Sequence, residues 1–140
     1  MQAIKFCAIT LLIFFISNSY AATTNPECLN HLGGAFADVE CYNGLSNDLI
    51  EENKILINKI SSTIPAENPN KNLLKQYAHQ QKESKKYCQL SRDSLNAWVT
   101  EKPASNPRYF YYDAAYYQCV YDNNKYSNGF LKEILKNTTQ

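Results

Sequence analysis

The sequence predicts an all-α fold: an antiparallel bundle of three helices, or four with a short extra one, stapled by two disulfides. Apolar residues recur at three- and four-residue steps along most of the chain, and no segment shows the alternation of a strand. Two Asn-Pro pairs, at 68–69 and 106–107, are typical helix starts. Four cysteines remain after an N-terminal export signal is removed, and an even number in an exported chain indicates disulfides.

Residues 1–21 have the features of a secretory signal peptide. Lys5 supplies the positive charge, residues 6–16 form the apolar region, and Ser19 and Ala21 place small side chains before the cleavage point. The apolar run has only about a dozen residues, whereas a membrane span needs roughly 20. Cys7 leaves with the signal. We therefore expect residues 22–140 to form a single helical, disulfide-bonded domain that is periplasmic or secreted, with no membrane association.

The first helix is expected over residues 35–64, after the turn at Gly33-Gly34. Its apolar positions follow a helical spacing: Val39, Tyr42, Leu45, Leu49, Leu56, Ile60 and Ile64. Gly44 is a point at which this helix can kink or split.

The second helix is expected to start at Asn68-Pro69 and to run to about Thr100. Its middle, residues 78–86, is polar on every side and should stand in water. Trp98, near its end, is expected to plug the core beneath the following loop, residues 102–106.

The third helix is expected from Asn106-Pro107 through Tyr126, with Asn128-Gly129 ending it or bending it before residues 130–135. It carries eight aromatic residues between 109 and 126. Phe110, Ala114, Tyr117 and Tyr121 follow one stripe and are expected in the core. One helix face cannot bury all eight rings, so some tyrosines should reach the surface and contact a partner. The candidates for that contact are Tyr111, Tyr112 and Tyr116.

The cysteine pairing follows from helix geometry. Cys88 lies 12 residues before Thr100, and Cys119 lies 12 residues after Pro107. At about 1.5 Å per residue, each sits roughly 18 Å from the same connecting loop. Antiparallel helices would therefore bring the two cysteines level, within reach of a disulfide. The remaining pair is Cys28 with Cys41, which would pin the N-terminal segment to the first helix.

Charge and motifs exclude several classes of function. Of the 14 basic residues only Lys5 lies in the signal, so 13 remain to balance 13 acidic ones. This balance argues against nucleic acid and against anionic membranes as partners. His31 and His79 stand in no metal motif, and no nucleophile elbow or phosphate-binding loop occurs. Glu51 and Glu52 diverge by about 100° on a helix and cannot flank one bond. We expect no enzyme activity, no cofactor and no metal.

The cysteine frame resembles that of the LprI-like lysozyme-inhibitor family. The similarity lies in Cys28, in the run Ala37-Asp38-Val39-Glu40-Cys41 and in Asn53; it continues in Cys88, in Tyr117-Gln118-Cys119 and in a last helix that closes on Leu131. The chain departs from the family pattern before its third cysteine, where Gln80, Ser84 and Lys85 replace a tryptophan and an Arg-Asp pair. The resemblance implies an exported bacterial protein that binds lysozyme and blocks peptidoglycan hydrolysis.

Three functions are therefore weighed. The first is inhibition of a lysozyme-like peptidoglycan hydrolase, with Lys102 or Arg108 in the loop before the third helix reaching the acidic pair of the hydrolase. The second is immunity against a wall-degrading toxin. The third is a small-ligand carrier or structural periplasmic module, with the tyrosines lining a pocket.

Overall fold

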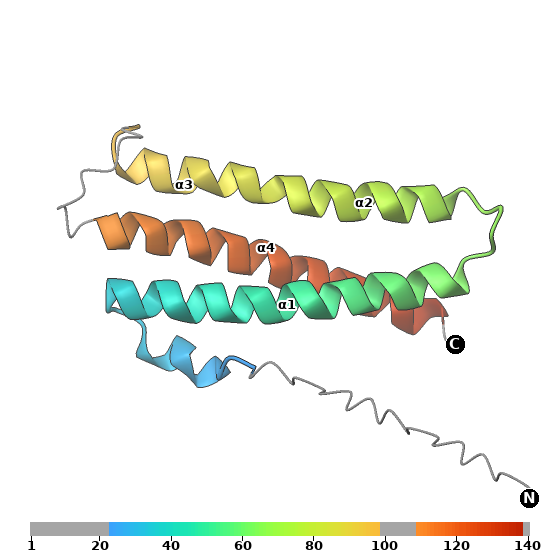
Figure 1. The fold of residues 1–140 in the computed structure, drawn as a ribbon, viewed down its shortest axis with the longest axis horizontal. Coiled ribbons are helices and arrows are strands. Elements are labelled where there is room, and N and C mark those ends of the chain that lie inside the picture. The colour runs from blue at the N-terminus through green and yellow to red at the C-terminus, as the bar shows by residue number, and fades with distance from the viewer. Residues whose placement is uncertain (1–22, 99–108, 139–140) are drawn as a thin grey trace, which may run out of the picture.

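The computed structural model describes residues 23–98 and 109–138, together with their side chains except those of residues 109 and 110. Its elements are η1 (Pro26–His31), α1 (Ala35–Thr63), α2 (Asn70–Ser84), η2 (Lys85–Tyr87), α3 (Cys88–Leu95) and α4 (Tyr109–Thr138). Figure 1 shows them in order along the chain. The described part contains four α-helices and no strand, which confirms the all-α fold. The predicted signal peptide, residues 1–21, lies outside the described residues.

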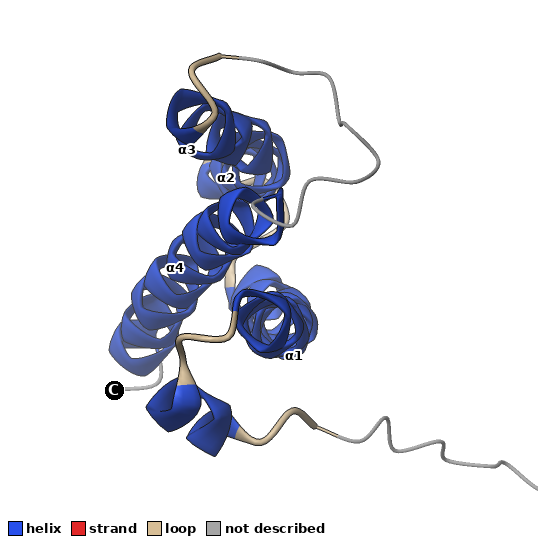
Figure 2. Cartoon of the chain, turned by 90° about the vertical axis from the view of Figure 1, so that its left-hand side faces the viewer, coloured by secondary structure: helices blue, strands red, loops and turns tan. Residues whose placement is uncertain are grey.

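The long helices α1 and α4 run side by side in the same direction, and α2, η2 and α3 return between them in sequence (Figure 1). Seen along the bundle in Figure 2, α4 lies between α1 and the α2–α3 arm, and η1 lies beside α1. The arm therefore packs mainly on α4, and α1 meets α2 only near the turn that joins them. As a result, α4 is the helix on which the other elements are assembled.

Helix α1 runs unbroken through Gly44, so the expected kink or split is wrong. The reason for a glycine here is the close approach of the N-terminal segment. A Cβ atom on Gly44 would lie 2.5 Å from Oγ1 of Thr24. The Thr24 N–H donates to a carboxylate oxygen of Asp48 at 2.7 Å, which fixes this segment across α1.

Helix α2 begins as the sequence predicts. The side chain of Asn68 accepts a hydrogen bond from the Asn70 N–H at 2.9 Å, and Pro69 provides the first turn. The expected long helix is divided, however, because a 3₁₀ turn, η2, separates α2 from α3. None of residues 78–86 is buried, as expected from their polarity.

Helix α4 continues through Asn128-Gly129 to Thr138, so the predicted end of the helix at this pair is wrong. The physical reason is tertiary packing, which usually outweighs local propensity. Asn128 and Leu131, on either side of Gly129, are both buried. Gly129 itself faces open space.

A polar seam joins α1 to α4 at mid-length; we use this term for Ser46, Asn53, Asn124 and Asn128. All four side chains are buried. Asn128 Nδ2 donates to Asn53 Oδ1 at 2.9 Å, and Asn53 Nδ2 donates to the Asn124 carbonyl at 3.1 Å. Asn124 Nδ2 donates to Ser46 Oγ at 2.7 Å. No buried side-chain polar atom of the described residues lacks a partner, so the seam fixes the register of α1 on α4 at little cost.

The apolar core lies beyond the seam, toward the C-terminal ends of α1 and α4. It consists of Leu56, Ile60, Leu74 and Leu131. On the other side of the seam the two helices meet through the rings of Tyr42 and Tyr121, whose centroids are 5.7 Å apart. The interface therefore changes along its length from aromatic to polar to aliphatic.

Both predicted disulfides are confirmed. Cys28 pairs with Cys41 at a Cα–Cα distance of 5.8 Å, and Cys88 pairs with Cys119 at 5.5 Å. The first holds η1 on α1, and the second holds α3 on α4. The argument from equal spacing to the loop was sufficient, because α3 and α4 are antiparallel neighbours.

We predict that Gly129→Ala stabilises the protein. Gly129 has a helical backbone and its Cβ would meet no other atom within 4 Å. Replacing an exposed helical glycine by alanine should raise the free energy of unfolding by about 0.5–1 kcal/mol. Urea denaturation measures this. Gly33→Ala is the control: its φ of +126° is unfavourable for alanine, so it should destabilise. A loss of stability in Gly129→Ala would contradict the continuous helix.

We predict that Asn53→Ala destabilises the protein by about 1–3 kcal/mol, because it leaves the buried Nδ2 of Asn128 without an acceptor. Thermal unfolding followed by circular dichroism measures the change. Asn58→Ala, at an exposed position of the same helix, should change stability by less than about 0.5 kcal/mol. Equal effects of the two substitutions would show that the seam does not join α1 to α4.

Candidate functional site

The part of the bundle where α3 ends and α4 begins is held by the Cys88–Cys119 disulfide, and we call it the disulfide end. Cys88 is fully buried, and Asn123 Nδ2 donates to its sulfur at 3.3 Å. Because α3 and α4 are antiparallel and level at this disulfide, residue 96 stands level with residue 111. Arg92 and Asp113, whose side chains approach to 3.8 Å, agree with this register. The C-terminus of α3 and the first turn of α4 therefore lie next to each other.

An ion-pair cluster supports the disulfide end from inside. Asp93 is buried and accepts hydrogen bonds from Gln89 Nε2 at 2.9 Å and from Arg92 Nε at 3.1 Å. The Gln89 hydrogen bond, followed by the hydrogen bond and charge of Arg92, holds the pKa of Asp93 below its ordinary value of 3.8. Arg92 also faces Asp113 of α4. The Arg92–Asp113 contact therefore links α3 to α4.

Helix α3 ends in a turn that displays Trp98. Ala97 and Trp98 both have positive φ angles, 50° and 65°, and the Trp98 N–H donates to the Asp93 carbonyl at 2.7 Å. This is the hydrogen bond of a Schellman motif, with alanine where glycine is usual. The turn stops the helix and carries Trp98 away from the core, so that its side chain is 66% exposed. The prediction that Trp98 plugs the core is therefore wrong.

Large apolar side chains are left exposed at this end of the bundle; we call them the aromatic surface. They are Tyr87, Leu90, Leu95, Trp98 and Tyr111. Four of them come from η2, α3 and the turn after it, and Tyr111 comes from the first turn of α4. Rigid aromatic rings of this kind supply contact area at low entropic cost, and tryptophan and tyrosine are enriched among residues that dominate protein interfaces. Each of these five side chains exposes more than half of its area at this end of the bundle.

The predicted partner residues divide into three groups. Tyr111 is 61% exposed and belongs to the aromatic surface. Tyr112 and Tyr116 are half-buried, and the Tyr116 ring packs edge-on against Tyr117 at 5.2 Å. Lys102 and Arg108 lie outside the described residues. Of the predicted core stripe, Ala114, Tyr117 and Tyr121 are half-buried.

Sequence reasoning missed the exposure of Tyr87, Leu90 and Leu95. A signal for the exposure of Tyr87 was present. Adjacent residues of a helix diverge by about 100°, so Tyr87 cannot share the inward direction of Cys88 once that cysteine is bonded to the third helix. The sequence gives no comparable signal for Leu95.

The histidines and the two adjacent glutamates singled out in the sequence lie apart from the disulfide end. His31 and His79 are both exposed. Glu51 pairs with Lys54 at 2.6 Å and Glu52 with Lys132 at 2.8 Å, as expected for a solvated face. Across residues 23–98 and 109–138, no three histidine, cysteine or acidic side chains gather as metal ligands would. Among the described helices, none combines the length and the apolar character needed to cross a bilayer.

Comparison with known proteins gives no relative: no family model, no curated protein and no solved structure matches the chain. The site must therefore be interpreted from its own geometry.

We predict that the Asp93 carboxylate makes the protein less stable as the pH falls into the acidic range. Because folding lowers the pKa of Asp93, its contribution is present above the ordinary value of 3.8 and is lost as pH falls through the lowered pKa. The wild type should therefore lose stability over this range, and Asp93→Asn should lose less. Denaturation series at several pH values measure the difference between the two proteins. Parallel pH curves would contradict this role of Asp93.

Proposed function

We propose that this chain is an exported binding protein that inhibits a lysozyme-like peptidoglycan hydrolase. The observation that carries the proposal is the aromatic surface, with Trp98 and Tyr111 exposed on an end where a disulfide and the Arg92–Asp113 contact join α3 to α4. Binding through preorganised side chains loses little conformational entropy, which favours affinity. The two disulfides indicate an oxidising environment outside the cytoplasm, and a periplasmic or secreted location is part of this proposal.

The choice of a lysozyme as partner is supported by the resemblance of the cysteine frame to the LprI-like inhibitors. The sequence between Trp98 and Tyr111 is also consistent with a lysozyme as partner. Lys102 and Arg108 belong to the segment that connects Trp98 to Tyr111 in the sequence, so both ends of this segment lie at the aromatic surface. A basic side chain from this segment would meet the two carboxylates on which a glycosidase depends. The proposed inhibitor thus occludes the cleft and uses no chemistry of its own.

The test is a titration of oxidised residues 22–140 against chicken-type, goose-type and invertebrate-type lysozymes, with lysis of a peptidoglycan suspension as the readout. We expect stoichiometric inhibition of at least one type. Trp98→Ser and Tyr111→Ser should each raise the inhibitor concentration needed by roughly tenfold or more, as expected for hot-spot residues. Arg108→Gln should weaken inhibition as well.

The matched control is Tyr126→Ser. Tyr126 is 79% exposed on the same helix as Tyr111, about 22 Å further along it, and should be neutral for inhibition. Equal losses for Tyr126→Ser and Tyr111→Ser would reject the aromatic surface as the contact. Inhibition of none of the three lysozymes would reject the function itself, and neutralisation of a wall-degrading toxin instead would assign the protein to immunity.

A further inference from the structure

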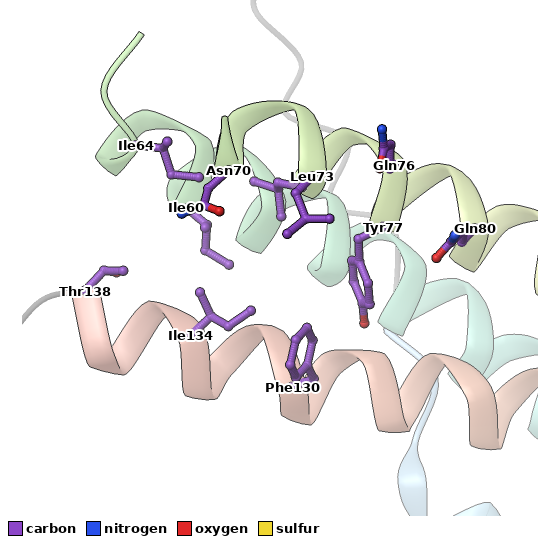
Figure 3. A pocket seen from close by; sticks show the side chains of 11 residues that line it. Ile60, Ile64, Asn70, Leu73, Gln76, Tyr77, Gln80, Phe130, Ile134 and Thr138 are labelled. Atoms are coloured by element: carbon purple, nitrogen blue, oxygen red, sulfur yellow. The ribbon is translucent and has the colours of Figure 1, made fainter. Parts of the chain in front are cut away.

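A second feature lies at the opposite end of the bundle, about 28 Å along α4 from Tyr111. Between α2 and the C-terminal halves of α1 and α4 there is a cavity of about 470 Å³. Figure 3 shows apolar side chains from three helices and from the residue after α1 directed into it: Ile60 from α1, Ile64 just after that helix, Leu73 and Tyr77 from α2, and Phe130 and Ile134 from α4. Its volume falls within the range of roughly 300–1,000 Å³ found for small-molecule sites.

The cavity exists because α2 is held at a few points only. Leu74 reaches the apolar core, the Tyr77 hydroxyl is 2.9 Å from Ser127 Oγ, and the Tyr77 and Phe130 rings lie 5.2 Å apart. No disulfide of the described chain holds α2 itself, whereas α3 is bonded to α4 through Cys88. The space between these contacts and the turn at residues 64–69 stays unfilled.

The cavity is open to solvent and leaves apolar area uncovered. Leu73 and Phe130, which line it, are 60% and 42% exposed, while its floor at Ile60 is 2% exposed. Contiguous exposed apolar surface that surrounds a concave site is typical of ligand or partner binding. A partner helix is roughly 10 Å across with its side chains, so this volume would hold only about one turn of it. The size favours a small molecule.

The lack of charged side chains in the lining indicates which kind of molecule the cavity can bind. Among the residues that the structure describes, no lysine, arginine, histidine or side-chain carboxylate lines the cavity. The only ionisable group in the lining, the Tyr77 hydroxyl, interacts with Ser127, and burial raises its pKa above the ordinary value of 10.0, so it is neutral. The polar lining residues are exposed amides and one hydroxyl, Asn70, Gln76, Gln80 and Thr138, which stand at the rim. A charged group here would find no counter-charge, whereas a hydroxyl or an ester would find hydrogen-bond partners.

We propose that this cavity binds an uncharged amphipath, with its hydrocarbon part between α2 and α4 and its neutral polar group at the amide rim. The site is separate from the aromatic surface and does not depend on the proposed inhibition of a hydrolase. It also differs from the expected pocket of a carrier, because Tyr77 of α2 lines it and the tyrosines of α4 do not.

The test uses oxidised residues 22–140 and N-phenyl-1-naphthylamine, a neutral dye whose fluorescence rises in apolar surroundings. We expect one dye molecule per protein and displacement by 1-decanol. Decanoate and decyltrimethylammonium, which have the same chain with a negative or a positive head, should compete at least about tenfold less well. Failure of the dye to bind, or equal competition by the three compounds, would overturn the proposal.

Two variants locate the site. Leu73→Trp fills the cavity mouth and should weaken dye binding at least tenfold. Ile55→Trp, at a similarly exposed aliphatic residue of α1 outside the cavity lining, should leave binding unchanged. Gln80→Lys places a cation at the exposed rim and should improve decanoate relative to 1-decanol, which keeps the proposal testable if Leu73→Trp fails to fold. Equal effects of the two tryptophan variants, or no change in selectivity with Gln80→Lys, would overturn the proposal. So would a stable dimer in sedimentation that Leu73→Trp dissociates, because a second copy would then occupy the cavity.

Discussion

The pairing of α1 with α4 through buried amides is the constraint on which the rest of the structure depends. Asn128 donates to Asn53 across the interface, Asn53 donates to the Asn124 carbonyl, and Asn124 donates to Ser46. A shift of one helix along the other by a single residue would leave these groups buried and unpaired, at a cost that an aliphatic interface would not impose. The seam is uncharged, so it adds register without the desolvation penalty of a buried ion pair. The seam thus sets the alignment of the two long helices, and the other elements pack on this pair.

The two ends of the α2–α3 arm are held on this pair of helices by different numbers and kinds of contacts. At α3, the disulfide to α4 and the contact of Arg92 with Asp113 of α4 hold the arm firmly. At α2, Leu74 and the Tyr77–Ser127 hydrogen bond are the main links. A firmly held end can present fixed side chains such as Trp98 to a protein, whereas a loosely held helix leaves room for a small ligand. One structural asymmetry thus accounts for both proposed sites.

Much of the fold could be predicted from the sequence, because cysteine positions and helix starts depend on short-range rules. The equal spacing of Cys88 and Cys119 from one loop was enough to pair them, and Asn68-Pro69 was enough to start α2. The errors arose where tertiary packing overrides a local signal. Gly129 marks no break because Asn128 and Leu131 are buried on both sides of it.

Less of the candidate sites than of the fold could be predicted from the sequence. Trp98 is exposed because a turn with positive φ angles carries it away from the core. Such a turn usually has glycine where this chain has Ala97, so the sequence does not indicate the turn. The cavity was not foreseen because it comes from space between helices that no single segment encodes. Exposure of Tyr111 was within reach, since one face cannot hold eight aromatic rings.

The central claim is that one rigid helix pair keeps a protein-binding end and a ligand-binding end apart. Hydrogen–deuterium exchange on the oxidised chain tests it most directly, with a lysozyme and with 1-decanol added separately. The account predicts that lysozyme protects amides of residues 87–98 and of the first turns of α4, and that 1-decanol protects those of α2 and of residues 130–138. In both cases exchange at the polar seam should stay slow and unchanged. Protection of the same residues by both additions, or rapid exchange at Asn53 and Asn124, would contradict it.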